Sequence, residues 1–288
     1  MKIQTFSILA GTGACNASCP YCISKMTGKK RIGFKEQKIN WRNFHKACRL
    51  SQVNNVSTVL ITGKGETTLY PNQITDYLSH MRKFDFPLIE LQTNALALEK
   101  EGFEEYLKKW YALGLNTMAI SIAHYKRERN GEIFTPNKEY IDLEEIIKKL
   151  HDLNFSVRLS CVLVKGFIDS PKEIKKLAEF AKNNSVEQLT IRKLGLVEHS
   201  ENKDVEEWCR QHVLINSEIK VIKDYMDKNA RKLMTLSHGA VIYELDGQNI
   251  CLTDCEMVQP KSDEIRTLIF FPDGRLRWNW EYGGAILL

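Results

Sequence analysis

The chain has 288 residues, of which 43% are hydrophobic and 27% are charged, and its formal net charge is +5 at pH 7. This composition is that of a globular protein long enough to bury a sizeable core, in one barrel-sized domain or two ordinary ones. The 41 basic residues exceed the 36 acidic ones only mildly and are spread along the sequence, so a dedicated nucleic-acid-binding protein is not favoured.

No segment of the sequence reads as a targeting or membrane signal. The first ten residues are too short and too polar for the apolar region of a signal peptide, and no run approaches the roughly 18 apolar residues of a membrane span. We therefore expect a cytoplasmic protein. In that reducing compartment the eight cysteines are expected to be metal ligands or buried thiols rather than disulfides.

Apolar runs alternate with amphipathic stretches through about residue 195. The short apolar runs predict strands and the helical periodicities predict helices. The expected strands cover residues 3–10, 58–62, 88–93, 117–122, 155–164 and 188–192. The expected helices cover residues 40–51, 73–83, 101–113, 142–153 and 171–183. This alternation predicts parallel strands with right-handed crossovers, in an open doubly wound sheet or in a barrel.

The pattern changes after about residue 195. A long polar helix is expected over residues 205–231, followed by short alternating runs and by the hairpin turn signal Pro272-Asp273-Gly274. We therefore expect two domains. The first is an α/β core over residues 1–198, and the second is a helix with a small β-rich extension over residues 199–288.

Three cysteines with C-x3-C-x2-C spacing, Cys15, Cys19 and Cys22, lie in a loop rich in Gly, Asn and Ser after the first strand. A four-iron cluster usually takes four cysteine thiolates, so three would leave one iron free to bind a reactant. Two alternatives remain open. Cys48 or His45 would complete a zinc site at an untypical spacing, and the three cysteines could also be clustered by chance.

With Tyr21 directly before its third cysteine, the motif resembles the signature of the radical S-adenosylmethionine (SAM) superfamily. The core is most similar to the branch that includes the molybdenum-cofactor cyclase and the proteins with SPASM or twitch extensions. The resemblance implies a partial (β/α)6 barrel, with the cysteine loop after its first strand and the functional residues at the carboxyl ends of its strands. It also implies a four-iron four-sulfur cluster whose open iron chelates the amino and carboxylate groups of SAM, with Tyr21 beside the cofactor.

The turn after the second strand, from Gly63 through Gly65 and Glu66, resembles the family's Gly-Gly-Glu-Pro motif, which holds the SAM amino group. Glycines there let the backbone approach a ligand closely. Lys64 replaces the first glycine of the motif and Thr67 replaces the proline. We therefore expect main-chain carbonyls to make the contact, with Glu66 as their support.

The third strand alternates apolar and polar residues, which places Glu90, Gln92 and Asn94 on one face. A polar face inside a barrel is costly unless a partner satisfies it, so this face predicts an interior lined by ligand. By similarity to the family, Ser121 and Arg192 on later strands, and also Asn94, are expected to contact SAM. The alternative is that these residues only cap strand ends.

A charged loop from Ala123 to Asn130 follows the fourth strand and includes His124. Its position above the expected pocket is compatible with a clamp for an anionic substrate. A solvated surface loop is the simpler interpretation, and we favour it.

A second cysteine pair, Cys251 and Cys255, precedes the expected hairpin in the tail. Tails of this kind carry auxiliary clusters in many members of the family. Here Trp278 stands where a further ligand is expected, and two thiolates do not fill a ligand set unless Cys209 or substrate adds a third. We expect a degenerate, twitch-like extension that keeps its hairpin as a lid or substrate platform and holds no second cluster.

The resemblance implies an enzyme that takes an electron from an external reductant such as flavodoxin or ferredoxin. It would cleave SAM to a 5′-deoxyadenosyl radical and abstract a hydrogen atom from a peptide, a nucleotide or a small metabolite, which the sequence does not identify. The alternative is a non-catalytic, cysteine-ligated zinc module that binds a partner through its basic surface.

Overall fold

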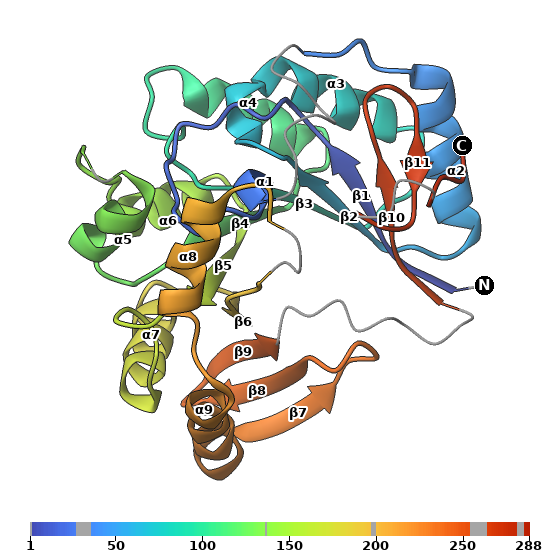
Figure 1. Cartoon of the computed structure of the whole chain (residues 1–288). Coiled ribbons are helices and arrows are strands. Elements are labelled where there is room, and N and C mark those ends of the chain that lie inside the picture. Colours follow the sequence, from blue (N-terminus) through green and yellow to red (C-terminus); the bar gives the residue numbers. More distant parts are fainter. Residues whose placement is uncertain (1, 27–35, 136, 197–199, 254–263, 281–284) are drawn as a thin grey trace.

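The computed structural model of the chain describes residues 2–26, 36–135, 137–196, 200–253, 264–280 and 285–288, which form one curved sheet with helices along its outer side (Figure 1). The strands are β1 (Lys2–Leu9), β2 (Thr58–Thr62), β3 (Leu88–Thr93), β4 (Thr117–Ile122), β5 (Ser156–Leu163), β6 (Gln188–Lys193), β7 (Arg231–Thr235), β8 (Val241–Leu245), β9 (Gln248–Thr253), β10 (Glu264–Phe270) and β11 (Leu276–Arg277). The helices are α1 (Ile23–Met26), α2 (Trp41–Val53), α3 (Pro71–Met81), α4 (Phe103–Ala112), α5 (Arg127–Phe134), α6 (Leu143–Asp152), α7 (Pro171–Asn183), α8 (Lys203–His212) and α9 (Asn216–Asn229), with a short 3-10 turn at Thr67–Leu69.

The expected strand–helix alternation is confirmed, and strands β1 to β6 pair in parallel in chain order. The helix ends have local causes. The Ser170 side chain accepts a hydrogen bond from Glu173 N at the start of α7, and Asp142 caps α6 in the same way. Helix α4 ends before Gly114, whose φ of +102° favours glycine.

Two strands from the C-terminal part of the chain extend the same sheet at both of its edges. Strand β9 pairs in parallel with β6, and β10 pairs in parallel with β1. The sheet order is therefore β11-β10-β1-β2-β3-β4-β5-β6-β9-β8-β7. The partial barrel is confirmed as open, because no ladder joins the two outermost strands within the described residues. A domain boundary near residue 198 stays a proposal, and the strands on its far side share the sheet of the core.

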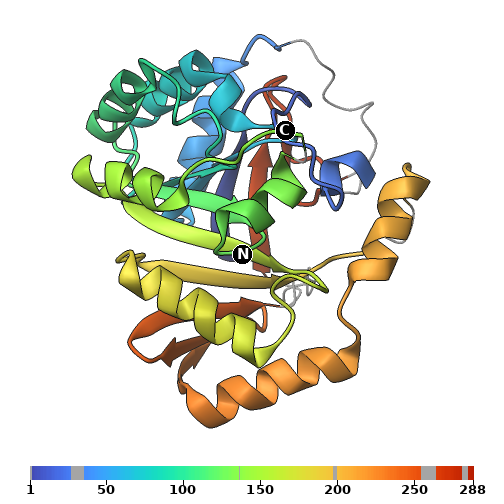
Figure 2. The same cartoon turned by 90° about the vertical axis from the view of Figure 1, so that its left-hand side faces the viewer.

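The expected single helix over residues 205–231 is wrong. Helix α8 ends at His212 and α9 begins at Asn216. They are flanked by Val213 and Ile215, two β-branched residues with extended backbone. The break lets the two helices bury different faces. Helix α8 contacts α1, close to the cysteine loop, whereas α9 contacts α7, β7 and β8 (Figure 2).

The two edges of the curved sheet approach each other at its amino-terminal end. The Gln4 side chain on β1 donates to Ser237 Oγ at 2.7 Å, in the turn between β7 and β8, and to Glu264 Oε2 at 2.8 Å, on β10. Side chains therefore bridge part of the gap that backbone hydrogen bonds leave open. The carboxyl ends of the strands lie at the opposite end of the sheet.

The two faces of the sheet differ in chemistry. Phe6 on β1 packs against Phe44 of α2, with ring centroids 6.5 Å apart, so this side of β1 faces the helices. The adjacent Ser7 points the other way, and the strand register places Leu60 and Glu90 on its side. The inner face therefore carries polar side chains while the outer face holds most of the apolar core.

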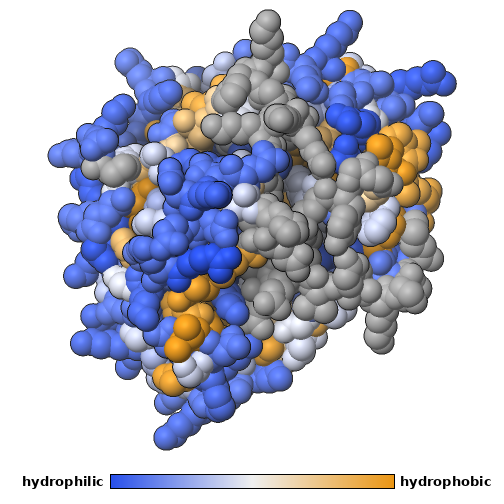
Figure 3. Space-filling model, in the orientation of Figure 1, coloured by the Kyte–Doolittle hydropathy of each residue, from blue (hydrophilic) through white to orange (hydrophobic). Residues whose placement is uncertain are grey.

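On the face shown in Figure 3, the coloured surface is mostly polar, and its apolar side chains form separate groups. No helix in the described ranges is long and apolar enough to cross a membrane.

Candidate active site

The three cysteines of the motif lie in one loop between β1 and α1. Burial raises the pKa of Cys15, and burial together with the neighbouring Cys22 and Cys15 thiols raises the pKa of Cys19 to about 12. Lys25 is a cation near Cys15 and Cys19, and its ammonium donates to the Cys19 carbonyl at 2.9 Å. A cation bound at this loop would favour the thiolate form of Cys15 and Cys19, which is the form that binds metal.

The described residues contain no group of three or more Cys, His, Asp or Glu side chains placed to hold one metal ion. The loop therefore does not show the single point of convergence that a zinc ion requires. The thiolates of a four-iron cluster bind separate irons, so they need no common point.

The glycine turn after β2 packs directly on the cysteine loop, as expected from the motifs. Gly65 N donates to Thr12 O at 3.0 Å, and Glu66 N donates to Ala14 O at 2.9 Å. A Cβ atom on Gly65 would lie 1.9 Å from Ala14 O, closer than any side chain can approach. The chain therefore forms a close-packed cradle of two loops at the carboxyl ends of β1 and β2.

The Glu66 carboxylate is buried and its hydrogen bonds come from the protein itself. Its Oε1 accepts from Thr68 N at 3.0 Å, from Thr68 Oγ1 at 2.6 Å and from Thr93 Oγ1 at 2.5 Å. Its Oε2 accepts from Asn94 N at 2.8 Å. The side chain therefore ties the glycine turn to the end of β3.

Asn94 joins the end of β3 to the cysteine loop. Its Nδ2 donates to Asn16 Oδ1 at 2.8 Å and to Cys15 Sγ at 3.7 Å, while its Oδ1 accepts from Leu96 N at 3.0 Å. The structure thus brings three of the predicted features together: the cysteine loop, the glycine turn and the end of β3.

Ser121 lies half-buried at the end of β4, in register with Ser160 of β5. Ser160 is in turn paired with Thr190 of β6, and Thr190 with Cys251 of β9. A row of four hydroxyl and thiol side chains therefore crosses adjacent strands on one face of the sheet. This row is the polar lining that the strand patterns predict.

Two arginines, Arg158 and Arg192, lie close together on the inner face, and Arg158 contacts the carboxylate of Glu90. Arg158 forms an ion pair with Glu90, which also accepts from Gln92 Nε2 at 3.2 Å. Burial lowers the pKa of Arg158, Glu90 opposes this shift and the nearby Arg192 reinforces it. The Nε atoms of Arg158 and Arg192 are buried and have no hydrogen-bond partner among the described residues. Among the described residues, the inner face therefore offers two buried guanidinium donors without partners.

Tyr21 belongs to the cysteine loop, and its ring faces helix α8. Its ring is 5.9 Å from that of Trp208, and burial followed by the Cys19 thiol raises its pKa well above the ordinary value. Met26, at the end of α1, packs with Cys209 and other apolar residues of α8 and β6. Cys209 is fully buried in this apolar cluster, away from any role as a ligand in its present position.

Tyr140 is a site residue that the sequence patterns missed. It is only 2% exposed, and its hydroxyl has no hydrogen-bond partner within the described residues. Its pKa is raised by burial first and then by the Cys19 thiol, which places the hydroxyl beside the cysteine loop. A buried hydroxyl without a partner among the described residues calls for a partner outside them, and a cluster or SAM in the cradle fits that requirement. Tyr140 lies between α5 and α6 without a periodic pattern, so no local signal marks it.

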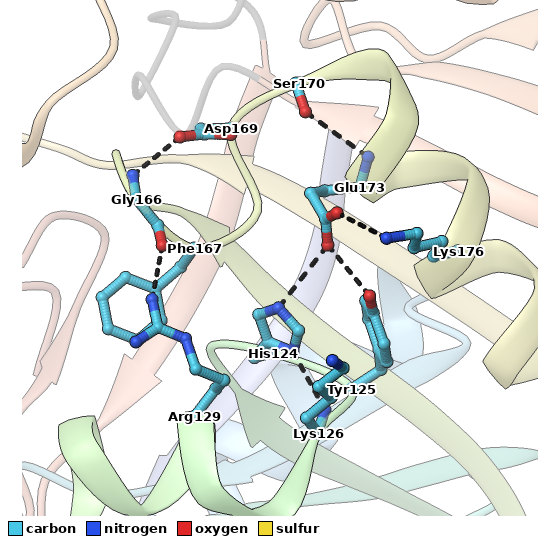
Figure 4. A pocket seen from close by; sticks show the side chains of 10 residues that line it. All are labelled: His124, Tyr125, Lys126, Arg129, Gly166, Phe167, Asp169, Ser170, Glu173 and Lys176. Atoms are coloured by element: carbon cyan, nitrogen blue, oxygen red, sulfur yellow. Dashed lines mark hydrogen bonds and ion pairs between the residues drawn. The ribbon is translucent and has the colours of Figure 1, made fainter.

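The loop after β4 forms one side of a hollow of about 420 Å³ (Figure 4). His124 Nδ1 accepts from Lys126 N at 2.9 Å, so the ring carries its proton on Nε2, which faces Glu173 Oε2 at 3.6 Å. Tyr125 and Lys176 also donate to Glu173, each at 3.0 Å. The interpretation of a solvated loop is therefore wrong for His124, which is buried, and the Tyr125 hydroxyl links this loop to α7.

The second cysteine pair is only partly visible. Cys251 is half-buried on β9, whereas Cys255 lies outside the described residues. Trp278 is 41% exposed. A degenerate extension without a second cluster therefore stays a prediction.

An open parallel barrel with three cysteines in its first loop, packed against a glycine turn after its second strand, defines a class of cluster-binding enzymes. The sequence profile of the Radical SAM superfamily matches residues 9–181, more than half of the chain. The chain belongs to this superfamily, whose members use a four-iron four-sulfur cluster and SAM. Membership of this superfamily favours a cluster-binding protein over the alternative of a non-catalytic zinc module.

Similar proteins cover most of the chain. GTP 3′,8-cyclase of Aquifex aeolicus (strain VF5) is 27% identical over 222 residues, which cover 76% of this chain and 63% of the relative. SuiB of Streptococcus suis, solved bound to S-adenosylmethionine, has a TM-score of 0.63 at 16% identity, covering 99% of this chain and 62% of SuiB. The protein anSMEcpe with bound AdoMet has a TM-score of 0.60 at 10% identity, covering 99% of this chain and 77% of that protein. The chain therefore spans less than two thirds of the length of the first two.

Proposed function

We propose that Cys15, Cys19 and Cys22 hold the four-iron cluster and that the protein abstracts a hydrogen atom from its substrate. The observation that carries this proposal is the cradle in which the cysteine loop meets the glycine turn without room for a Cβ at Gly65. Reductive cleavage of SAM to methionine and a 5′-deoxyadenosyl radical is the chemistry that the bound cluster supplies, with an electron from flavodoxin or ferredoxin.

The residues around the cradle supply the binding groups for SAM in this proposal. Main-chain carbonyls of the turn at Gly63 and Gly65 accept from its ammonium, because the Glu66 carboxylate already accepts hydrogen bonds from Thr68, Thr93 and Asn94. Ser121 and Arg192 offer a hydroxyl and a guanidinium from β4 and β6. Tyr21 closes the loop side with its ring.

The inner face favours a substrate with an anionic group. Within the described residues, the Nε donors of Arg158 and Arg192 are buried without partners, and Glu90 pairs with Arg158. Guanidinium groups recognise carboxylates and phosphates through paired hydrogen bonds. We infer that the substrate is a small molecule, a nucleotide or a peptide that carries such a group on the side that enters the barrel.

Anaerobic reconstitution of the protein tests the proposal. The wild type is expected to bind about four irons and to release 5′-deoxyadenosine from SAM after reduction. Cys22→Ala is expected to lose this activity. Cys48→Ala is the matched control, because it also removes a thiol, from a fully buried position on α2.

The same pair of variants separates the proposal from its alternatives. Iron content and 5′-deoxyadenosine formation in Cys48→Ala should match the wild type apart from a loss of stability. Product formation by Cys22→Ala would place the cluster elsewhere. A colourless wild type with one zinc, lost in Cys48→Ala, would mean a zinc site completed by Cys48.

A further inference from the structure

We propose that Asn94 is a positioning residue that donates a hydrogen bond to the thiolate of Cys15 and thereby raises the reduction potential of the cluster. The inference rests on the proposed function, because it takes Cys15 as a ligand of the cluster. It adds a role that neither the cysteine motif nor the glycine turn carries.

The orientation of the Asn94 amide follows from its hydrogen bonds. Oδ1 accepts from Leu96 N at 3.0 Å, and a backbone N–H only donates, so the oxygen has to lie on that side. The Nδ2 group therefore faces the cysteine loop. One of its two hydrogens is taken by Asn16 Oδ1 at 2.8 Å, and the other is directed to Cys15 Sγ at 3.7 Å.

The position of the amide is held from several sides. Asn94 is 6% exposed, and its backbone N–H donates to the buried Glu66 carboxylate at 2.8 Å. Ala95, the next residue, has a φ of +64°, and its N–H donates to Thr93 Oγ1 at 2.9 Å. This turn directs the Asn94 side chain away from the strand and toward the loop. A donor held this firmly loses little entropy when it binds the sulfur.

Cys15 Sγ receives a second hydrogen bond, from Ala17 N at 3.4 Å. The sulfur of Cys15 thus has one donor from its own loop and one from the end of β3. Of the two, only the donor from Asn94 can be removed by changing a side chain.

Hydrogen bonds to cluster sulfurs stabilise the state with more negative charge, which is the reduced state. Removal of the Asn94 donor should therefore disfavour reduction. SAM cleavage begins with reduction of the cluster, so the amide would ease the first electron transfer from the external reductant.

The test is a redox titration of the reconstituted protein without SAM, followed by electron paramagnetic resonance. At the wild-type midpoint potential, Asn94→Ala is expected to hold about three- to tenfold less reduced cluster relative to oxidised, where tenfold corresponds to about 59 mV for one electron. Asn94→Asp has nearly the same shape, keeps an acceptor for Leu96 N and replaces the donor with a carboxylate. Its potential is expected to be lower still.

Asn16→Ala is the matched control. It removes the other partner of the Asn94 amide, also in the cysteine loop, and leaves the donor to Cys15 in place. The midpoint potential of its cluster should equal that of the wild type. If Asn94→Ala does not fold, Asn94→Asp decides the question alone.

Wild-type potentials in both Asn94 variants at normal iron content would overturn the inference and leave the proposed function standing. In that case a loss of SAM affinity in Asn94→Ala would assign the amide to SAM instead. A wild-type protein that fails to assemble a four-iron cluster would overturn the proposed function and this inference together, and iron analysis detects that before any titration.

Discussion

Gly65 lies where the glycine turn touches the cysteine loop, and the space there excludes any side chain. Its amide donates to Thr12 O, and an added Cβ would lie 1.9 Å from Ala14 O. This contact is made by backbone on both sides, so no rotamer change can relieve a clash. At the scale of single residues, the close contact of the two loops thus requires a residue without a Cβ atom at position 65.

We expect Gly65→Ala to separate the two loops and to prevent stable binding of the cluster and SAM. Overpacking of this kind typically costs about 1–3 kcal/mol, and backbone on both sides leaves little room to relax. Iron content after reconstitution and SAM affinity measure the effect. Gly195→Ala is the control, since nothing lies within 4 Å of the added Cβ there. Wild-type iron and SAM binding in Gly65→Ala would show that the loops do not meet as described.

The second prediction at this scale concerns the buried hydroxyl of Tyr140 and the stability of the protein. Because it has no hydrogen-bond partner in the described part of the chain, Tyr140→Phe should stabilise the apoprotein by about 1 kcal/mol, through the removal of an unsatisfied group. In the reconstituted protein with SAM the gain should shrink or reverse if the hydroxyl finds its partner there. Urea unfolding of both forms measures this difference. A clear loss of stability in the apoprotein would mean that the hydroxyl is already satisfied.

At the scale of elements, the loop after β4 is linked to helix α7 by the Tyr125 hydroxyl, which donates to Glu173, and His124 lies buried beside this contact (Figure 4). Burial lowers the pKa of His124 from 6.5 to about 4, against the opposing effect of Glu173. Lys126 and Arg129 nearby reinforce the shift. The ring is therefore neutral at pH 7. Its Nδ1 accepts from Lys126 N, and its Nε2 lies 3.6 Å from Glu173 Oε2, beyond hydrogen-bond distance.

Stability is expected to fall on acidification because of this histidine. Its pKa in the folded state lies below that in the unfolded state, so the unfolded state binds the proton more readily between pH 6.5 and about 4. In this window the free energy of unfolding should decrease with falling pH by at most about 1.4 kcal/mol per pH unit. His124→Gln has no titrating ring and should lose this part of the slope. Urea unfolding of both proteins from pH 7 to pH 4 measures it, and identical slopes would contradict the assignment.

At the scale of the whole molecule, the C-terminal part of the chain completes the sheet of the core. Strand β10 covers the edge of β1, and β9 covers the edge of β6. Uncovered edges expose unpaired backbone groups and promote aggregation. The first strand therefore lies between β2 and the C-terminal strand β10. Residues far apart in the sequence, such as Gln4 and Glu264, are in direct contact there.

We expect residues 1–198 produced alone to aggregate or to remain unfolded, because both edges of the sheet would be exposed. Co-expression with residues 199–288 should restore soluble material. Size-exclusion chromatography and circular dichroism report the outcome. A monomeric, folded 1–198 fragment would instead support an independent core domain.

The superfamily of the protein and most of its local structure could be predicted from the amino-acid sequence alone. Periodicity and capping residues such as Ser170 are local properties, and they predicted the parallel strands and helices of the core. The spacing of Cys15, Cys19 and Cys22, together with the turn at Gly65 and Glu66, was enough to indicate the superfamily. These features can be predicted because each depends on residues close together in the sequence.

The contacts between these helices, strands and loops became known only from the three-dimensional structure. The split between α8 and α9 follows from two different packing surfaces, and the sites of β9 and β10 follow from edges that need partners. The Asn94 amide, which reaches Cys15, and the Tyr140 hydroxyl beside Cys19 acquire their roles from segments distant in sequence. No local pattern records such contacts, because they arise only when the curved sheet brings the ends of its strands together.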